Sequence, residues 1–320
     1  MPKTLMCDPA LLQKDLRDRV YIVTGANSGA GLSTSEQLLR QGAHVVGACR
    51  RVEAGEAAFA GFARLRGSAE IMKLDLASLA SVRRFADEFL AARDRLDGLV
   101  NNAGLVTNEG RTEDGFEIQF GTNHLGHFLL TELLLDVLKA SAPARIVSLS
   151  SVLHVGSRSR VADIDFADLN FERRPYNSTI AYSQSKLANL LHAKELAKRL
   201  DGTGVCAFSV HPGWIRSNFG SGVMPGWLRG ALNLLLRPFS GFLGILTPYE
   251  GAQTTLHCLL DDDAPQHNGA YFSQNSILYP NRENRPGGWP MPSPNPNAHD
   301  AELARRLYEV SLEMVGIDGK

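Results

Sequence analysis

The chain carries no excess of charge of either sign. Its 320 residues include 33 Lys and Arg against 34 Asp and Glu, which gives a formal net charge of -1. Proteins that bind nucleic acid or an acidic membrane surface through charge show a basic excess or a basic stripe. The composition gives no electrostatic case for either partner, and we expect no nucleic-acid ligand.

Cysteine is scarce, and metal-ligand spacing is absent. No two of the four cysteines have the spacing of a zinc site or a redox pair: Cys7, Cys49, Cys206 and Cys258. The nine histidines form no His-x-x-x-His pair, and no nearby carboxylate completes a metal site with His124 and His127. We therefore expect no metal and a reduced, cytoplasmic protein.

Long hydrophobic runs are also missing. The first eight residues contain no apolar run of signal-peptide length. Residues 219–246 are rich in Leu, Met, Trp and Phe, but Arg229, Arg237 and Pro238 interrupt them, which makes a poor transmembrane span. The sequence thus predicts no transmembrane segment, and it leaves peripheral docking of this stretch on a membrane open.

What the sequence does have is a globular composition, with 44% apolar residues, and a regular alternation of short β-rich and longer helical runs. Seven runs predict strands: 20–23, 44–49, 70–74, 98–100, 145–149, 205–210 and 270–272. Helices are predicted at 32–41, 79–92, 116–138, 179–200, 248–260 and 301–315. The alternation predicts an α/β fold, a doubly wound parallel sheet with helices on both faces.

A glycine-rich turn follows the first predicted strand. It reads Thr24-Gly25-Ala26-Asn27-Ser28-Gly29-Ala30-Gly31 and leads directly into a predicted helix. Glycines allow close approach of the backbone to a pyrophosphate, and the helix N-terminus offers free N–H groups to the anion. The turn therefore indicates a dinucleotide site, although strand–helix turns in many other proteins also use glycine.

The end of the second predicted strand bears on which nucleotide would bind. NAD sites place an acidic residue there for the ribose 2′-hydroxyl. Here Arg50 and Arg51 follow Cys49, and no acid occurs before Glu53. Because a guanidinium suits a 2′-phosphate through paired hydrogen bonds, we expect NADP(H) to be favoured over NAD(H). The alternative is a solvated basic turn, above all at Arg51.

Tyr182 and Lys186 lie four residues apart in a predicted helix, so their side chains share one face. The free pKa of tyrosine is about 10, and a nearby ammonium favours the phenolate and lowers that pKa. Such a phenol could exchange a proton with an alcohol or a carbonyl near neutral pH. Taken alone, the spacing is also a common accident on amphipathic helices.

Together these motifs resemble the short-chain dehydrogenase/reductase family over residues 18–272. The family's motifs occur in order: the glycine turn, Asn101-Asn102-Ala103-Gly104, Asn123, Ser151, Tyr182-x-x-x-Lys186 and Pro212-Gly213. Residues 123–128, 185–189 and 211–217 look like the branch that holds retinol dehydrogenases, WW-domain oxidoreductase and protochlorophyllide reductase. The resemblance implies a Rossmann-like, seven-stranded fold in a single NAD(P)-binding domain over residues 1–320. A substrate lid would span about 219–247, and a loop-rich C-terminal extension about 280–320.

The resemblance also implies a catalytic set. Tyr182 would act as the acid–base residue, while Lys186 would lower its pKa and hold the ribose of the nicotinamide. Ser151, rather than Ser150, would bond the substrate oxygen, and Asn123 would support a water between Lys186 and solvent. The alternatives are structural: a helix-kink residue at Asn123 and a turn residue at Ser151.

A cofactor-contacting set follows from the same resemblance. Asp75 and Leu76, after the third strand, would meet the adenine, although Asp75 could instead cap the next helix. Ile215 would contact the nicotinamide carboxamide, and Ser217 stands where the family usually has threonine. The full set is Gly25, Asn27, Ser28, Gly29, Ala30, Gly31, Arg50, Arg51, Asp75, Leu76, Asn102, Ala103, Gly104, Tyr182, Lys186, Pro212, Gly213, Ile215 and Ser217.

These roles imply an NADP(H)-dependent oxidoreductase that interconverts a carbonyl and an alcohol. The apolar content of residues 219–246 favours a bulky hydrophobic substrate, unless these side chains only pack on the core, and an insertion at 154–176 would wall the substrate pocket. Two alternatives stay open: reduction of an activated carbon–carbon double bond and a catalytically idle nucleotide-binding scaffold. Assembly into a homo-oligomer also stays open.

Overall fold

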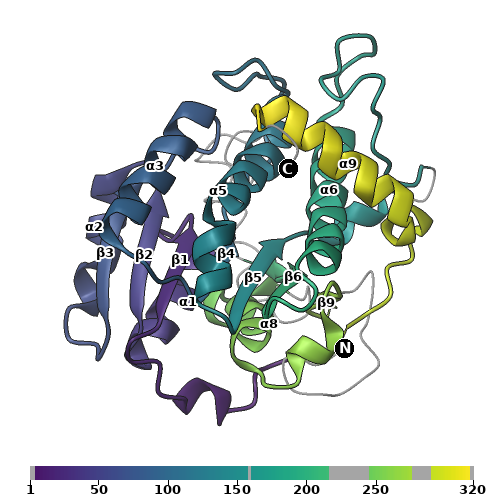
Figure 1. Ribbon diagram of the computed structural model, residues 1–320. Helices are drawn as coiled ribbons and strands as arrows, with labels where there is room; N and C mark the ends of the chain where they lie inside the picture. The colour runs from purple at the N-terminus through teal and green to yellow at the C-terminus, as the bar shows by residue number, and fades with distance from the viewer. Residues whose placement is uncertain (1–3, 158–159, 216–244, 276–289, 318–320) are drawn as a thin grey trace.

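Seven parallel strands form one sheet at the centre of the molecule (Figure 1). The computed structural model describes residues 4–157, 160–215, 245–275 and 290–317. The strands are β1 (Val20–Thr24), β2 (His44–Cys49), β3 (Ser68–Lys73), β4 (Gly98–Asn101), β5 (Ala144–Leu149), β6 (Val205–His211) and β9 (Tyr271–Ser273). Their order across the sheet is β3-β2-β1-β4-β5-β6-β9, which confirms the predicted Rossmann-like, seven-stranded fold.

The sheet has its switch point at β1. This strand pairs with β2 on one side and with β4 on the other, both in parallel register. In open α/β sheets, the ligand crevice forms outside the carboxyl ends of the strands at such a point. The topology therefore indicates where a site should lie before any side chain is considered.

Helices connect the strands and continue beyond the last one. They are α1 (Gly29–Arg40), α2 (Val52–Phe59), α3 (Leu79–Ala92), α4 (Ile118–Phe120), α5 (Gly126–Ala140), α6 (Ser178–Arg199), α8 (Pro248–Leu260) and α9 (Ala301–Val315). The bounds of α3, α8 and α9 are those predicted from the sequence. The sequence does not predict α2, because Gly55 is a poor helix former; a Cβ at Gly55 would lie 2.7 Å from a methyl group of Ile71 in β3.

The predicted continuous helix over 116–138 is wrong in its first part. The carboxylate of Glu117 accepts from the N–H groups of Gln119 (2.9 Å) and Phe120 (2.6 Å), so the short α4 begins only after Glu117. A π-helical turn, Gly121–Leu125, then separates α4 from α5. Such turns add a residue to one helical turn and are frequent at functional sites.

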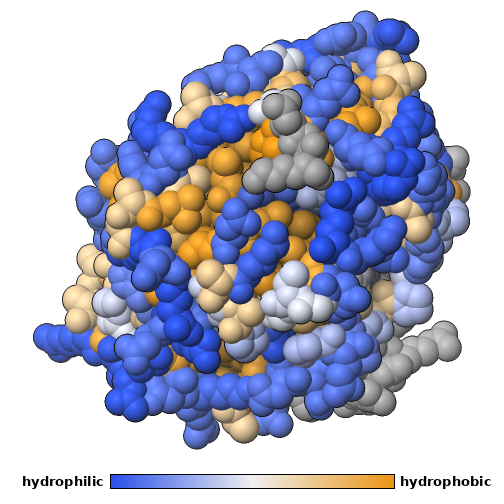
Figure 2. All heavy atoms as spheres, in the orientation of Figure 1, coloured by the Kyte–Doolittle hydropathy of each residue, from blue (hydrophilic) through white to orange (hydrophobic). Residues whose placement is uncertain are grey.

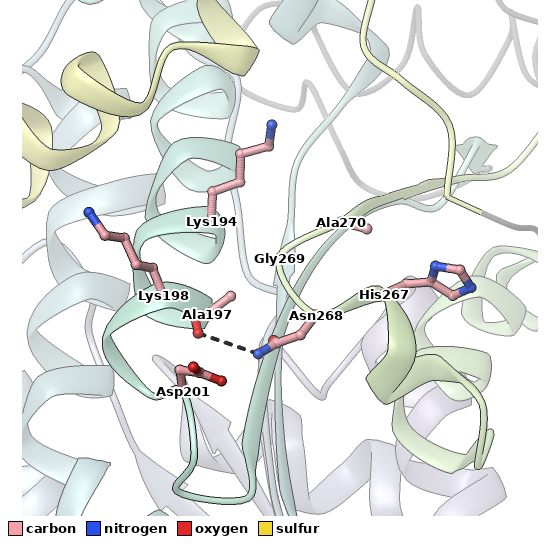
Figure 3. A pocket seen from close by; sticks show the side chains of 8 residues that line it. All are labelled: Lys194, Ala197, Lys198, Asp201, His267, Asn268, Gly269 and Ala270. Atoms are coloured by element: carbon pink, nitrogen blue, oxygen red, sulfur yellow. Dashed lines mark hydrogen bonds between the residues drawn. The ribbon is translucent and has the colours of Figure 1, made fainter.

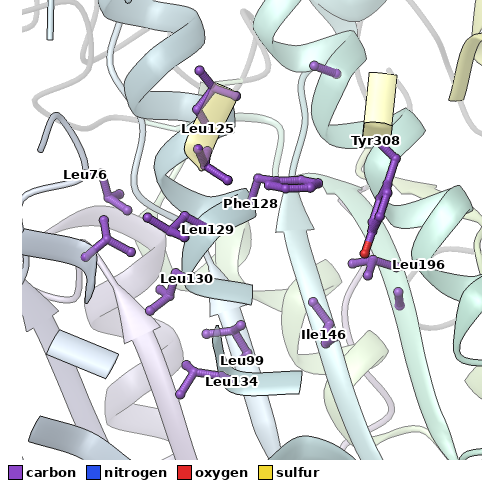
Figure 4. Packing of buried hydrophobic residues seen from close by; sticks show 14 of the residues in the cluster. Leu76, Leu99, Leu125, Phe128, Leu129, Leu130, Leu134, Ile146, Leu196 and Tyr308 are labelled. Carbon is purple, nitrogen blue, oxygen red and sulfur yellow. The ribbon is translucent and has the colours of Figure 1, made fainter. Parts of the chain in front are cut away.

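The helices cover both faces of the sheet. Helices α3, α5 and α6 lie on one face and α1 and α8 on the other, while α9 packs against α6 and α5 (Figure 1). On the first face, Phe128 and Leu129 of α5 belong to a buried cluster with Leu99 of β4 and Ile146 of β5 (Figure 4). Tyr308 brings α9 into the same cluster, so the C-terminal helix is part of this core.

The insertion that separates Ser151 from Tyr182 folds back on α6. The side-chain amide of Gln184 accepts from the backbone N–H of Asp165 (3.1 Å) and donates to the carbonyl of Leu169 (3.3 Å). Within the insertion, the guanidinium of Arg174 lies 4.0 Å from the centroid of the Phe171 ring and 2.6 Å from the carboxylate of Asp165. The insertion is therefore a packed element and not a free loop.

None of the described helices combines the length and the hydropathy that crossing a bilayer requires. Figure 2 shows the same face of the molecule with a mainly hydrophilic rim and hydrophobic residues gathered toward the centre. Large hydrophobic side chains are exposed in the described ranges at Leu90, Val161, Trp214 and Tyr249. Trp214 follows directly on Pro212-Gly213, one of the predicted cofactor-contacting turns.

Two neighbours on α3 test the packing of the first face. Phe89 is fully buried, whereas Leu90 is 41% exposed. We expect Phe89→Ala to lower the free energy of unfolding by about 3–5 kcal/mol, because it removes buried apolar surface and leaves a cavity. Leu90→Ala should cost less than about 1 kcal/mol. Chemical denaturation measures both, and similar losses for the two variants would contradict this packing.

Candidate active site

The predicted site residues come from distant parts of the sequence, yet most lie at one edge of the sheet. Gly25 follows β1, Asn102 follows β4, Ser151 follows β5 and Pro212 follows β6. Because the strands are parallel, their carboxyl ends meet at the same edge. The half of α6 that carries Tyr182 packs against the turn after β5 and so joins this group.

The glycine turn has the backbone geometry that a dinucleotide needs. Gly25 and Gly29 have φ angles of +64° and +58°, which side chains rarely allow. A Cβ at Gly31 would lie 2.4 Å from Nδ2 of Asn102, so no larger residue fits there. The N-cap residue Ser28 makes no side-chain capping bond, which leaves N–H groups in the first turn of α1 for an anion. These residues therefore fit a pyrophosphate.

Thr24 joins this turn to the one after β4. Its hydroxyl oxygen accepts from the backbone N–H groups of Asn102 and Ala103, both at 2.9 Å. The side chain of Asn102 donates to the carbonyl of Thr24 at 2.7 Å. The sequence places Thr24 in the glycine motif but does not single it out, because these partners lie 78 and 79 residues away.

The end of β2 lies next to the glycine turn. A backbone hydrogen bond from Asn27 to the thiol of Cys49 ties the two together. Arg50 and Arg51 follow directly and are both exposed, and among the described residues neither guanidinium is in an ion pair. The two arginines are thus free to bind an anion at this edge. Ala30, the remaining predicted residue of the glycine turn, is buried in the first turn of α1.

Asp75 and Leu76 lie just past β3. The carboxylate of Asp75 accepts from the N–H of Ala77 at 3.0 Å. Ser78, not Asp75, is the N-cap of α3, so the alternative role that the sequence allows for Asp75 is wrong. The side chain of Leu76 is buried in the core shown in Figure 4. A Cβ at Gly126 would lie 2.4 Å from the backbone carbonyl oxygen of Leu76.

Tyr182 and Lys186 are both almost fully buried, with 4% and 3% of their surface exposed. The ammonium nitrogen of Lys186 lies 5.6 Å from the centroid of the Tyr182 ring and donates to the carbonyl of Leu149 at 3.0 Å. Burial raises the pKa of Tyr182 above its usual value, and a hydrogen bond with Ser151 opposes this rise. Burial lowers the pKa of Lys186 to about 7.

The structure thus runs against the expectation that Lys186 lowers the pKa of Tyr182. Burial removes both side chains from water, and this desolvation favours the neutral phenol and the neutral amine. What the helical spacing predicts correctly is that the two side chains meet on one face of α6.

Ser151 and Ser150 have different partners. The hydroxyl of Ser150 donates to the carbonyl of Lys186 at 2.7 Å, within the core. Ser151 caps the 3-10 turn Val152–Val155, where its hydroxyl oxygen accepts from the N–H of Leu153 at 3.2 Å, and it also bonds to Tyr182. Ser151 is therefore the serine that lies beside the tyrosine hydroxyl.

Asn123 lies in the π-helical turn, and its side chain bonds to the backbone of Leu105 and to the hydroxyl of Ser185. Its carbonyl oxygen accepts from the N–H of Leu105 (2.9 Å), and its amide donates to the carbonyl of Leu105 and the hydroxyl of Ser185, both at 3.0 Å. A Cβ at Gly104 would lie 3.3 Å from Nζ of Lys186 and 3.4 Å from Oδ1 of Asn123. Both polar atoms therefore face the turn after β4.

Asn189 is a residue of this site that the sequence does not single out. Its side-chain amide donates to the carbonyl of Leu149 at 2.9 Å, the same oxygen that Lys186 uses. The only sequence signal is its place three residues after Lys186, on the same face of α6.

The turn after β6 is held by a second, two-stranded sheet. Gly213 has a φ of +87°, and a Cβ there would lie 2.4 Å from a methyl group of Leu246. Ile215 ends β7 (Trp214–Ile215), which pairs with β8 (Ile245–Leu246), and its side chain packs against Gly251 of α8. Ser217 and the predicted lid over 219–247, up to residue 244, lie outside the described residues.

A surface hollow of about 570 Å³ lies away from these residues, between the end of α6 and the start of β9 (Figure 3). It is lined by Lys194, Lys198, Asp201 and His267 among others. Because these residues precede β6 and β9, the hollow lies at the amino ends of the strands, opposite the candidate site. Among the described residues, no three His, Cys, Asp or Glu side chains gather as a metal site would require.

The parallel sheet and the glycine turn after β1 are features of nucleotide-binding dehydrogenases, and comparison with known proteins identifies the family. The chain belongs to the short-chain dehydrogenase/reductase family, whose short chain dehydrogenase model matches residues 19–162. Within the family it falls in the retinol dehydrogenase branch. It is 43% identical to retinol dehydrogenase 12 of Mus musculus over 302 residues, which cover 93% of this chain and 87% of the relative. It is 41% identical to retinol dehydrogenase 13 of Homo sapiens over 305 residues, covering 94% and 85%.

Solved structures show the same fold. A protein of Mycobacterium Paratuberculosis superposes with a TM-score of 0.73 at 33% identity, and 96% of each chain is covered. The RhlG/NADP active-site complex of Pseudomonas aeruginosa superposes with a TM-score of 0.64 at 26% identity, covering 81% of this chain and 95% of that one. The family binds NAD or NADP and catalyses oxidation or reduction.

Replacement of Lys186 by methionine tests its lowered pKa. The pKa of Lys186 is about 7 in the folded protein and about 10.4 in an unfolded chain. Between these values the unfolded state binds a proton that the folded state does not, so this group makes the wild type more stable as pH rises. Lys186→Met has no such group, so it should be more stable than the wild type at about pH 7. This difference in the free energy of unfolding should shrink as pH rises toward about 10.

Denaturant unfolding of both proteins across this pH range measures the difference. The exposed Lys198, replaced in the same way, serves as the control. A stability difference between wild type and Lys186→Met that does not change with pH would contradict the lowered pKa.

Proposed function

We propose that the protein is an NADP(H)-dependent oxidoreductase that interconverts a carbonyl and an alcohol on a bulky hydrophobic substrate, with Tyr182 as the acid–base residue. The observation that carries the proposal is the convergence of Tyr182, Ser151 and Lys186 at the sheet edge that also holds the glycine turn. A family of oxidoreductases supplies the reaction class.

The chain's own residues would handle the proton. A bound nicotinamide nucleotide would supply or accept the hydride at the carbinol carbon. In the reducing direction, the hydroxyl of Tyr182 would donate its proton to the carbonyl oxygen, and in the other direction the phenolate would take it back. The hydroxyl of Ser151, already bonded to Tyr182, would donate to the same oxygen and stabilise the negative charge that develops there.

Lys186 and Asn123 would restore the proton on Tyr182. The pKa of Lys186, lowered to about 7 by burial, allows this group to give or take a proton near neutral pH. Its Nζ and Oδ1 of Asn123 both face Gly104, which supports the proposal that Asn123 would hold a water between Lys186 and solvent. Lys186 would also hold the ribose hydroxyls of the nucleotide.

The preference for NADP(H) rests on the end of β2. Arg50 lies beside the glycine turn, and Glu53, the first acid after the strand, is exposed in the first turn of α2. A guanidinium would bind a 2′-phosphate, and no residue between the end of β2 and Glu53 offers a carboxylate to accept from a 2′-hydroxyl. The solved NADP complex of Pseudomonas aeruginosa RhlG supports this cofactor.

A bulky, apolar substrate is favoured by the relatives and by one surface feature. The retinol dehydrogenases are named for an alcohol with a long hydrocarbon skeleton. Trp214 is 63% exposed next to Ile215, on the turn that would contact the nicotinamide. The insertion at 154–176 packs on the part of α6 that carries Tyr182, where it would wall the pocket.

We also infer that residues 1–320 form one domain. The C-terminal helix α9 shares the buried cluster of α5 and α6, and the guanidinium of Arg83 in α3 donates to the carbonyl of Val315 at the end of α9 (2.6 Å). A separately folding C-terminal unit would need a core of its own.

Removal of the Tyr182 hydroxyl tests the acid–base role. We expect Tyr182→Phe to lower kcat by about 10²- to 10⁴-fold, because the ring remains but the proton donor is lost. The affinity for NADPH should be unchanged. A screen of ketones, aldehydes and secondary alcohols with NADPH and NADP, followed at the nicotinamide absorbance, identifies a substrate and measures both. Tyr249→Phe, which removes a hydroxyl from a 47% exposed residue, is the control. Full activity in Tyr182→Phe would refute the role.

Replacement of Arg50 tests the cofactor preference. We expect Arg50→Ala to weaken NADPH binding by about 10- to 100-fold, the loss of a charge-assisted hydrogen bond, and to leave NADH binding unchanged. Fluorescence titration with each nucleotide measures the two affinities. Arg64→Ala, at an exposed residue after α2, should change neither. Equal losses for NADPH and NADH would remove Arg50 as the reader of the phosphate.

A further inference from the structure

The backbone of Ser151 is held by a buried histidine that the proposed reaction does not use. Nδ1 of His154 bonds to the carbonyl oxygen of Ser151 at 2.5 Å, across the 3-10 turn that Ser151 caps. Nε2 of the same ring bonds to the hydroxyl of Ser293 at 2.6 Å. One imidazole therefore links the serine of the candidate site to a residue 139 positions later in the chain.

The bonding partners fix the protonation state of this ring. A carbonyl oxygen only accepts, so Nδ1 of His154 carries the proton. Nε2 then accepts from the hydroxyl of Ser293, whose oxygen accepts in turn from the N–H of Asn295 at 3.1 Å. His154 is 1% exposed, and burial lowers its pKa to about 4. The neutral ring thus persists across the pH range in which an oxidoreductase of this kind works.

The segment that supplies Ser293, residues 291–299, is tied to the same region by further bonds. The side-chain amide of Asn295 donates to the carbonyls of His154 (2.8 Å) and Ala162 (2.9 Å). At its start, the N–H of Met291 donates to the carbonyl of Tyr271 at 2.9 Å, and the ring of Tyr271 packs against the ring of His154 at 4.7 Å. The segment therefore fixes both the His154 ring and its backbone.

We propose that His154 is a positioning residue for Ser151, and that Ser293 and Asn295 of the C-terminal segment hold His154 in the required orientation. The Nδ1 bond fixes the carbonyl of Ser151 and, with it, the backbone that carries the hydroxyl bonded to Tyr182. The inference rests on the proposed role of Ser151 in the reaction. It assigns a catalytic contribution to a segment that lies far from the glycine turn and from Tyr182 in sequence.

Two amide substitutions at position 154 distinguish the hydrogen bond of the ring to Ser151 from its hydrogen bond to Ser293. Asparagine at position 154 places an N–H near the position of Nδ1, and glutamine places a polar atom near Nε2. We expect His154→Asn, which keeps the bond to Ser151, to retain kcat within about threefold. His154→Gln, which keeps only the bond to Ser293, should lower kcat by about 10- to 100-fold, the range that a misplacement of about 1 Å produces. The KM for NADPH should be unchanged in both.

A double variant distinguishes positioning from general stability. If His154 acts through Ser151, then His154→Gln should cause no further loss of kcat in a Ser151→Ala background, because residues that act as a unit are not additive. Independent losses that multiply would overturn the proposal. Equal losses of kcat in His154→Asn and His154→Gln, or unchanged kcat in His154→Gln, would also overturn it.

Two further variants test the proposal without a change at His154, in case that change impairs folding. Ser293→Ala removes only the outer hydroxyl and should lower kcat by a few-fold, with faster hydrogen exchange at the amide of Leu153. Ser141→Ala removes a buried hydroxyl that accepts from the N–H of Leu96 at the other end of the sheet, and it should lower stability without lowering kcat. Unchanged exchange and unchanged kcat in Ser293→Ala would remove the C-terminal segment from the proposal.

The outcome for Ser151→Ala alone separates this inference from the proposed function. Unchanged turnover in that variant would refute the role of Ser151 and, with it, the basis of the inference. Lowered turnover in Ser151→Ala together with normal turnover in His154→Gln would refute the inference alone.

Discussion

The hydroxyl group of Thr24 is the contact on which both halves of the candidate site depend. Its oxygen accepts from the N–H groups of Asn102 and Ala103. His127 bonds to it through Nε2 at 2.9 Å and, through Nδ1, to the carbonyl of Asn123 at 3.0 Å. Because a carbonyl only accepts, Nδ1 carries the proton and Nε2 accepts from Thr24. Thr24 therefore links the glycine turn and the turn after β4 to the π-helical turn that carries Asn123.

Burial decides the electrostatics of Tyr182 and Lys186. Burial lowers the pKa of Lys186 to about 7 and raises the pKa of Tyr182, so desolvation favours the neutral form of both groups. Nζ of Lys186 lies 5.6 Å from the centroid of the Tyr182 ring, and desolvation opposes any attraction between an ammonium and a phenolate there. Further polar groups, such as the hydroxyl of Ser151, have to stabilise a phenolate here.

Local pattern predicts much of this structure, and distant packing accounts for what it misses. Helices α3 and α8 match their predicted bounds because local caps define them, Ser78 for α3 and the Thr247–Glu250 capping box for α8. The helical spacing likewise brings Tyr182 and Lys186 together. The carbonyl that holds Lys186 is 37 residues away, however, and the hydroxyl that holds His154 is 139 residues away. No local pattern encodes such partners, nor the π-helical turn that re-aims Asn123.

Ser151 illustrates why those distant contacts matter for chemistry. A residue just past a strand lies in the least constrained part of an α/β edge, and fixing one backbone costs about 1–2 kcal/mol of conformational entropy. Here the carbonyl of Ser151 is bonded by His154 and its hydroxyl lies against Tyr182 and Leu153. That entropy is lost when the protein folds, and in the proposed reaction it would not have to be lost again when the substrate reacts. The C-terminal segment would then act on the reaction without touching the substrate, by limiting the orientations open to Ser151.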